Sequence, residues 1–176
     1  MPHIDLGNDA PGIVGLLRYR PETGKVLSEL AEVLLRGDNT LSRGERELIA
    51  SYVSTLNECG FCARSHGAFA AAQLDGGEEV VAHACAAPDT APISGKLRAL
   101  LRVAAAVRHG GSAVTPEDVA AAREAGATDT EIHDTVLIAA AFCMFNRYVD
   151  GLATTAPDDP APYAHRAAHI VAHGYL

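Results

Sequence analysis

The sequence of 176 residues has no surplus of basic side chains and no basic run. Lysine and arginine together number 14, against 22 aspartates and glutamates, and the formal net charge is −8. Proteins that bind nucleic acid or anionic membranes through charge show the opposite balance. We therefore expect neither nucleic acid nor a membrane as a partner.

Long hydrophobic runs are also absent. The longest apolar run, Val136 to Phe145, is about half as long as a helix must be to cross a bilayer. The first residues, MPHIDLGNDAPG, have neither the basic start nor the apolar segment of a signal peptide. We expect a soluble, cytoplasmic protein with a single domain over residues 1–176, long enough to bury a core without disulfides.

Strand patterns are missing as well, because no stretch alternates steadily between apolar and polar residues. Apolar residues instead recur at helical spacing, and glycine and proline mark the ends of the stretches. Residues 1–20 contain several glycines and are expected to be irregular. The sequence predicts an all-α fold of about seven or eight helices, at about 21–36, 42–56, 59–74, 78–86, 94–108, 116–125, 129–152 and 161–172.

Three of these helices carry clear start signals. A serine or threonine whose hydroxyl can accept a backbone N–H, followed three residues later by an acidic residue that reaches back, forms a capping box. Ser42 with Glu45 and Thr128 with Glu131 fit this pattern, and Thr115 is a simple cap.

A Cys-x-x-Cys pair, Cys59 and Cys62, is followed four residues later by His66. In a reducing compartment such a pair is more often catalytic or metal-binding than structural. A helix that begins at Cys59 places the three side chains on one face, with the thiols close enough to form a disulfide. The positive end of the helix favours thiolate over thiol, and His66 can exchange a proton with Cys62. We therefore predict a redox site at this helix N-terminus.

Glu47 lies twelve residues before Cys59, on the side of its helix opposite the apolar stripe. A carboxylate in that position is usually solvated. Its neighbours Ala50, Ser51 and Ser54 are small, however, and would let another helix approach closely. The periodicity leaves both arrangements open.

A zinc site built on Cys59, Cys62 and His66 would need a fourth ligand from elsewhere, and there is no second Cys-x-x-Cys to supply it. A pair of incidental buried thiols is a further alternative. Cys85 and Cys143 lie in apolar surroundings and are expected to be small hydrophobic residues of the core. No metal is expected at the cysteines.

Three histidines, His165, His169 and His173, recur every four residues on the last helix. Such a stripe can bind metal, but we interpret it as a solvated or subunit-contacting face. On the long helix, Arg147 and Asp150 follow the apolar centre and are expected to form an intrahelical ion pair or to cap the core.

The spacing Glu47-x11-Cys59-x2-Cys62-x3-His66 resembles the signature of AhpD-like alkylhydroperoxidases, within the carboxymuconolactone decarboxylase superfamily. The runs LSRGERELIA, at 41–50, and FNRYVDGLA, at 145–153, are similar to the branch described as peroxidase-related enzymes. The resemblance extends from about Pro11 to Leu152 and implies an AhpD-like helical fold. Decarboxylase relatives typically lack the cysteine pair, so decarboxylation fits less well.

The resemblance implies a thiol-dependent alkyl hydroperoxide reductase, a peroxidase with an antioxidant role. In that mechanism Cys62 attacks the peroxide, Cys59 closes a redox-active disulfide with it, and Glu47 and His66 relay protons. There is no bound cofactor; an external dithiol, in the family a lipoyl-type carrier or another thiol reductant protein, restores the thiols. Relatives form trimers or hexamers, so we expect a homo-oligomer.

Helix electrostatics alone favours Cys59, nearest the helix N-terminus, as the activated thiol. The resemblance assigns peroxide attack to Cys62, which we follow because His66 is one turn from Cys62 and almost two from Cys59. Two other functions stay open: a protein disulfide oxidoreductase or redox sensor, and a non-redox helical enzyme or scaffold in which the cysteines are dispensable.

Overall fold

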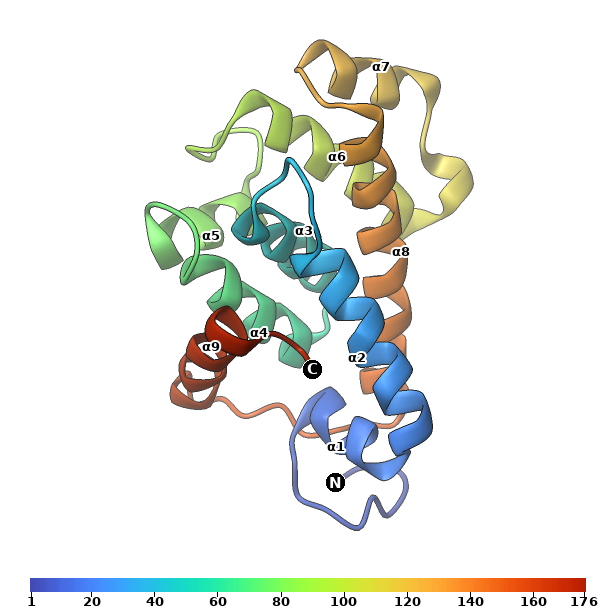
Figure 1. Cartoon of the computed structure of the whole chain (residues 1–176). Coiled ribbons are helices and arrows are strands. Elements are labelled where there is room, and N and C mark those ends of the chain that lie inside the picture. The colour runs from blue at the N-terminus through green and yellow to red at the C-terminus, as the bar shows by residue number, and fades with distance from the viewer.

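The computed structural model describes residues 1–176 and is entirely helical (Figure 1). It contains nine α-helices and one short 3-10 helix, η1, so the predicted all-α class is confirmed. The elements are α1 (Gly12–Tyr19), α2 (Pro21–Arg36), α3 (Arg43–Leu56), α4 (Gly60–Ala71), α5 (Gly77–Ala86), α6 (Gly95–His109), η1 (Gly111–Ala113), α7 (Pro116–Glu124), α8 (Asp129–Gly151) and α9 (Ala161–His173).

Helix α1 corrects the prediction that residues 1–20 are irregular. Its glycines are required by close packing and do not end the helix. Gly12 has a φ of +54°, and a Cβ atom there would lie 2.2 Å from the ring of Phe61. A Cβ atom at Gly15 would lie 2.5 Å from a backbone oxygen. Without a side chain at Gly12 the start of α1 can lie against Phe61 of α4, and without one at Gly15 the preceding segment can lie against α1.

The predicted helix starts are confirmed. In each of three capping boxes the hydroxyl accepts a backbone N–H and the acidic side chain accepts the N–H of the cap residue. The pairs are Ser42 with Glu45, Thr115 with Asp118, and Thr128 with Glu131.

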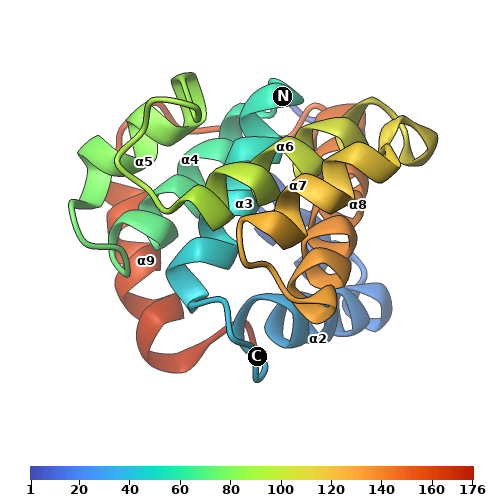
Figure 2. The same cartoon turned by 90° about the horizontal axis from the view of Figure 1, so that it is seen from above.

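Helix α3 is the centre of the fold. Ten of its 14 residues are buried, and it packs against α4, α6 and α8. Figure 2 shows α3 in the middle of the bundle, with α4 on one side and α8 on the other. The apolar centre of α8 contributes Ile138, Ala139 and Phe142 to the core, as its composition predicts.

Helices α3 and α4 approach each other across the small residues of α3. The Ser51 hydroxyl donates a hydrogen bond to the Ala63 carbonyl at 3.1 Å. A Cβ atom at Gly67 would lie 3.3 Å from Ser51 Oγ. The side of α3 that carries Glu47 therefore faces α4.

The segment that follows α9 turns back over the bundle, and Figure 1 shows the C end between α9 and α2. Arg36 of α2 donates to the Ile170 carbonyl at 2.8 Å, and the Tyr175 amide donates to Glu32 at 2.8 Å. These bonds hold the last residues against α2.

None of the helices combines the length and apolarity that crossing a membrane requires.

Candidate active site

The two cysteines of the motif lie at the start of α4, as predicted. Cys59 is the residue that precedes the helix, and Cys62 lies in its first turn. The exposed fractions of the two residues are 0% and 3%. Their position gives both sulfurs the partial positive charge of the helix N-terminus.

Glu47 and His66 form a hydrogen-bonded pair between α3 and α4. His66 Nδ1 lies 2.6 Å from Glu47 Oε2, and Glu47 is only 1% exposed. Of the two arrangements that periodicity left open for this carboxylate, the buried one is observed. The rings of Phe142 and Phe69 contact the imidazole edge-on, with centroids 4.5 and 5.1 Å away. Because Glu47 occupies Nδ1, Nε2 is the nitrogen that remains for proton exchange.

Tyr175 completes this pair and was not identified from the sequence. Its hydroxyl donates to Glu47 Oε1 at 2.6 Å, and its ring lies nearly parallel to that of His66. Burial, followed by the nearby Glu47 charge, raises the pKa of Tyr175 well above its ordinary value. The phenol therefore stays protonated and acts as a donor to the carboxylate. Glu47 and Tyr175 are 128 positions apart, so no local pattern connects them.

Asn146 of α8 is a second polar residue that the sequence did not assign to the site. Its amide donates to Ser54 at 3.0 Å and accepts from Asn57 at 2.9 Å. Arg108 in turn donates to Asn57. These bonds fix the orientation of the Asn146 amide beside Cys62.

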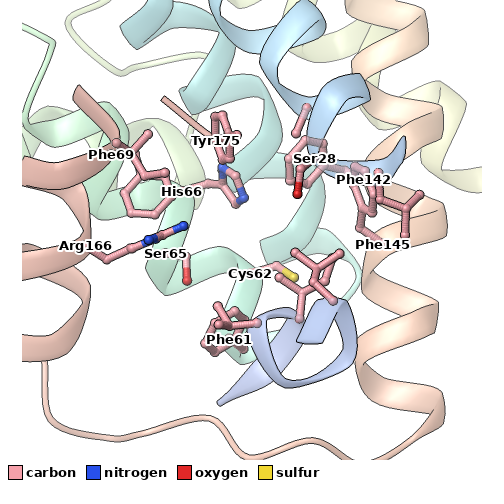
Figure 3. A pocket seen from close by; sticks show the side chains of 16 residues that line it. Ser28, Phe61, Cys62, Ser65, His66, Phe69, Phe142, Phe145, Arg166 and Tyr175 are labelled. Carbon is pink, nitrogen blue, oxygen red and sulfur yellow. The ribbon is translucent and has the colours of Figure 1, made fainter. Parts of the chain in front are cut away.

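A cavity of about 90 Å³ lies next to Cys62 and His66. Figure 3 shows Cys62, His66 and Tyr175 around it, with side chains from α2, α8 and α9 on its other sides. Twelve of its 16 lining residues are hydrophobic. The lining residues are Ile13, Val14, Leu17, Leu27, Ser28, Ala31, Phe61, Cys62, Ser65, His66, Phe69, Phe142, Phe145, Arg166, Ile170 and Tyr175. Cys62 therefore faces the cavity, whereas Cys59 does not line it.

Comparison with known proteins agrees with the motif. The profile of the Carboxymuconolactone decarboxylase family matches residues 21–91, which include Glu47, both cysteines and His66. Two crystal structures resemble the whole fold: an uncharacterized peroxidase-related protein from a Silicibacter species and another from Ralstonia eutropha, described as an alkylhydroperoxidase AhpD core. The first is 26% identical, with 88% of this chain and 78% of that one covered and a TM-score of 0.78. The second is 27% identical, with coverages of 88% and 80% and a TM-score of 0.78.

The family match and the two structures together support a relationship of this chain to the AhpD-like superfamily. A comparison with curated proteins finds no match.

The two thiols of the site differ in acidity. Hydrogen bonding from the Cys62 side chain, together with the Cys62 backbone N–H, lowers the pKa of Cys59. The hydrogen bond between the two thiols, followed by burial, raises the pKa of Cys62. A hydrogen bond with the Asn146 side chain lowers the pKa of Cys62 and partly opposes this rise. In the resting reduced protein the first proton thus leaves Cys59. This agrees with helix electrostatics, but only Cys62 faces the cavity, so a small molecule there meets Cys62.

Arg147 and Asp150 do not form the predicted ion pair. Arg147 donates to the backbone carbonyl of Cys143 at 2.8 Å and is exposed. Asp150 instead lies near Cys59, where hydrogen bonding and negative charge from Asp150 oppose the lowering of the Cys59 pKa. A carboxylate is therefore available beside the more acidic thiol.

The remaining cysteines and histidines lie away from this cavity. Cys85 and Cys143 are half-buried, Cys85 beside Ser51 and Cys143 beside Asn57. The last two histidine rings of the α9 stripe, those of His169 and His173, lie 4.9 Å apart. The structure contains no group of three or more histidine, cysteine or acidic side chains arranged to hold a metal ion.

Proposed function

We propose that the protein is a thiol-dependent hydroperoxide reductase, with Cys62 as the residue that attacks the peroxide. The observation that carries this proposal is the meeting of Cys62 and His66 in an apolar cavity, with His66 hydrogen-bonded to the buried Glu47. An apolar cavity suits the organic part of an alkyl hydroperoxide. A histidine held by a carboxylate suits the two proton transfers that the reaction needs.

The first step oxidises Cys62. His66 Nε2 accepts the Cys62 proton, and the thiolate attacks the terminal oxygen of the hydroperoxide. The O–O bond breaks, the sulfur loses two electrons and becomes a sulfenic acid, and the alkoxide takes the proton back from His66 as it leaves as an alcohol. Glu47 orients the imidazole and stabilises its charged form. Asn146 favours the Cys62 thiolate.

The second step forms the disulfide between Cys59 and Cys62. The Cys59 thiolate attacks the sulfenic sulfur, the S–O bond breaks, and the hydroxide leaves as water after taking up a proton. The lowered pKa of Cys59 supports this role because the resolving thiol must be deprotonated. An external dithiol, such as a lipoyl-type carrier, then reduces the disulfide and is itself oxidised to a disulfide.

Disulfide exchange with a protein substrate is a second candidate function. The lowered pKa of Cys59 favours it, because a thiolate at physiological pH is the species that exchanges. The burial of both cysteines favours the peroxide instead, because a protein disulfide is far larger than the cavity beside Cys62. We therefore place hydroperoxide reduction first.

The test is a stopped-flow reaction of the reduced protein with cumene hydroperoxide, with free thiols counted before and after. We expect both motif thiols to be lost at a rate proportional to peroxide, in the wild type and in Cys85→Ser, but not in Cys62→Ser. Glu47→Gln should react about 100-fold more slowly, within the usual range for loss of general acid–base catalysis. Thiols that survive peroxide but exchange rapidly with a protein disulfide would overturn the proposal in favour of the second function.

A further inference from the structure

The polar groups of the cavity are few and carry no negative charge. Among the 16 lining residues, the polar ones are Ser28, Ser65, His66 and Arg166, and none is an aspartate or glutamate. This contrasts with the chain as a whole, whose formal net charge is −8. The cavity is thus an apolar space with one permanent positive charge, on Arg166.

Arg166 makes no hydrogen bond or ion pair with any other residue of the structure, unlike the arginines around it. Arg36 is bonded to Glu32 and to the Ile170 carbonyl, and Arg64 is bonded to Tyr163. Figure 3 shows the Arg166 side chain extending from α9 toward the cavity, which Ser65 also lines. Arg166 is exposed even though it lines the cavity, so it lies where the cavity meets solvent.

A guanidinium with free donors is the side chain best suited to a carboxylate, because its planar fork can donate two parallel hydrogen bonds. No aspartate or glutamate lines the cavity to compete for this positive charge. Cys62 and Arg166 line the same cavity from α4 and α9. A molecule with a reactive group at one end and a carboxylate at the other can therefore contact both.

We propose that the hydroperoxide reduced here is that of an apolar carboxylic acid, whose carboxylate is held by Arg166 while its O–O group meets Cys62. This inference rests on the proposed function and assigns its substrate class. A carboxylate could also belong to the dithiol reductant, which would enter the same cavity in the other half of the cycle. The hydroperoxide and the dithiol would bind Arg166 through the same group, a carboxylate. Measuring oxidation of the protein by peroxide and its reduction by the dithiol separately distinguishes the two.

The experiment compares γ-hydroperoxyisocaproate with its methyl ester as oxidants of the reduced protein, by stopped flow. The proteins are the wild type, Arg166→Met, Arg166→Lys and, as a matched control, Arg43→Met. Arg43 is another exposed arginine without a hydrogen-bond or ion-pair partner, and it does not line the cavity. In a second arm, dihydrolipoate and dihydrolipoamide are compared as reductants of the oxidised proteins. Circular dichroism checks that each variant is folded.

We expect the wild type and Arg43→Met to prefer the acid over the ester by roughly ten-fold, the lower range for a hydrogen bond to a charged group. Arg166→Met should lose this preference through slower reaction with the acid, with the ester rate unchanged, and Arg166→Lys should keep part of it. Equal rates for acid and ester in the wild type would overturn the inference and leave the proposed function intact. A preference that depends on Arg166 only in the dithiol arm would assign the carboxylate to the reductant and overturn the inference as stated. If neither peroxide reacts, the inference and the proposed function both fail.

Discussion

At the scale of single residues, the Tyr175 hydroxyl is the contact with the clearest energetic consequence. It donates to a carboxylate that is 1% exposed, and a buried acceptor left without its donor keeps its desolvation cost. We expect Tyr175→Phe to lower the free energy of unfolding by about 1.5–3 kcal/mol, the range for hydrogen bonds to charged groups. Urea unfolding measures this. Tyr148→Phe is the matched control, because the Tyr148 hydroxyl has no hydrogen-bond partner in the structure and should change stability by less than about 0.5 kcal/mol. Equal losses in both variants would contradict the role of the Tyr175 hydroxyl.

The acidity of Cys59 predicts a pH dependence of the reduced protein. Folding lowers the pKa of this thiol below its ordinary value of 9.0. The Cys59 thiolate therefore stabilises the folded state fully above pH 9.0, and this contribution is lost as the pH falls through the lowered pKa. Titration of the ultraviolet thiolate absorbance should show a first deprotonation below pH 9.0 in the wild type that is absent in Cys59→Ser. The same step persisting in Cys59→Ser but vanishing in Cys62→Ser would mean that Cys62 is the more acidic thiol.

At the scale of helices, the close contact of α3 with α4 determines whether Glu47 meets His66. A side chain at Gly67, next to His66, would press on Ser51, since even a Cβ atom there lies 3.3 Å from Ser51 Oγ. We expect Gly67→Val to cost about 1–3 kcal/mol of stability by overpacking, and to slow the reaction with peroxide by moving His66 away from Glu47. Gly95→Val is the control: a Cβ atom at Gly95 meets nothing within 4 Å, so this variant should be nearly neutral. A fully active and stable Gly67→Val would show that the two helices have room to separate.

The helices also show which features sequence can predict. Caps and apolar periodicity are local, and they located α2 through α9 to within a few residues. The burial of Glu47 is not local, because it depends on which helix covers that side of α3; the sequence could show only that Ala50, Ser51 and Ser54 permit it. Helix α1 was missed because Gly12 is required by the Phe61 ring of α4, a neighbour that the sequence does not reveal.

In the candidate site, too, the local part could be predicted and the non-local part could not. Cys59, Cys62 and His66 lie within two turns of one helix, so their spacing alone predicts that they meet. Tyr175 and Arg166 reach the cavity through the docking of α9 and the segment after it. Neither residue belongs to a recognisable motif, and only the folded structure brings them to Cys62.

At the scale of the whole molecule, the outer face of α2 and α8 leaves apolar side chains uncovered. Val26 and Val33 of α2 are 61% and 68% exposed. Leu137 and Met144 of α8 are 40% and 44% exposed, and Val26 and Met144 border the same surface pocket. Apolar residues grouped in this way are typical of protein interfaces.

We therefore expect the protein to form a homo-oligomer through this face, in line with the trimers or hexamers that the sequence resemblance implies. Light scattering coupled to size-exclusion chromatography should give a mass several times the 18.4 kDa of one chain. The double variant Val26→Glu/Val33→Glu should shift the mass to that of one chain and remain folded, since both side chains are exposed in the single subunit. Ala120→Glu/Ala121→Glu changes two exposed residues of α7 that do not border this pocket, and it serves as the control. A wild type with the mass of one chain would contradict the expectation.

The hydrogen bond from Tyr175 to Glu47 also means that the residues of the candidate site are synthesised at very different times. A ribosome makes Glu47, both motif cysteines and His66 within the first 66 residues, but Tyr175 and Arg166 more than a hundred positions after Cys59. A nascent chain thus carries its thiols long before it carries the residues that complete their surroundings. We therefore expect the proposed reaction with peroxide to require α9 and the segment that follows it, because a chain whose translation stops before α9 carries the cysteines without Tyr175 and Arg166.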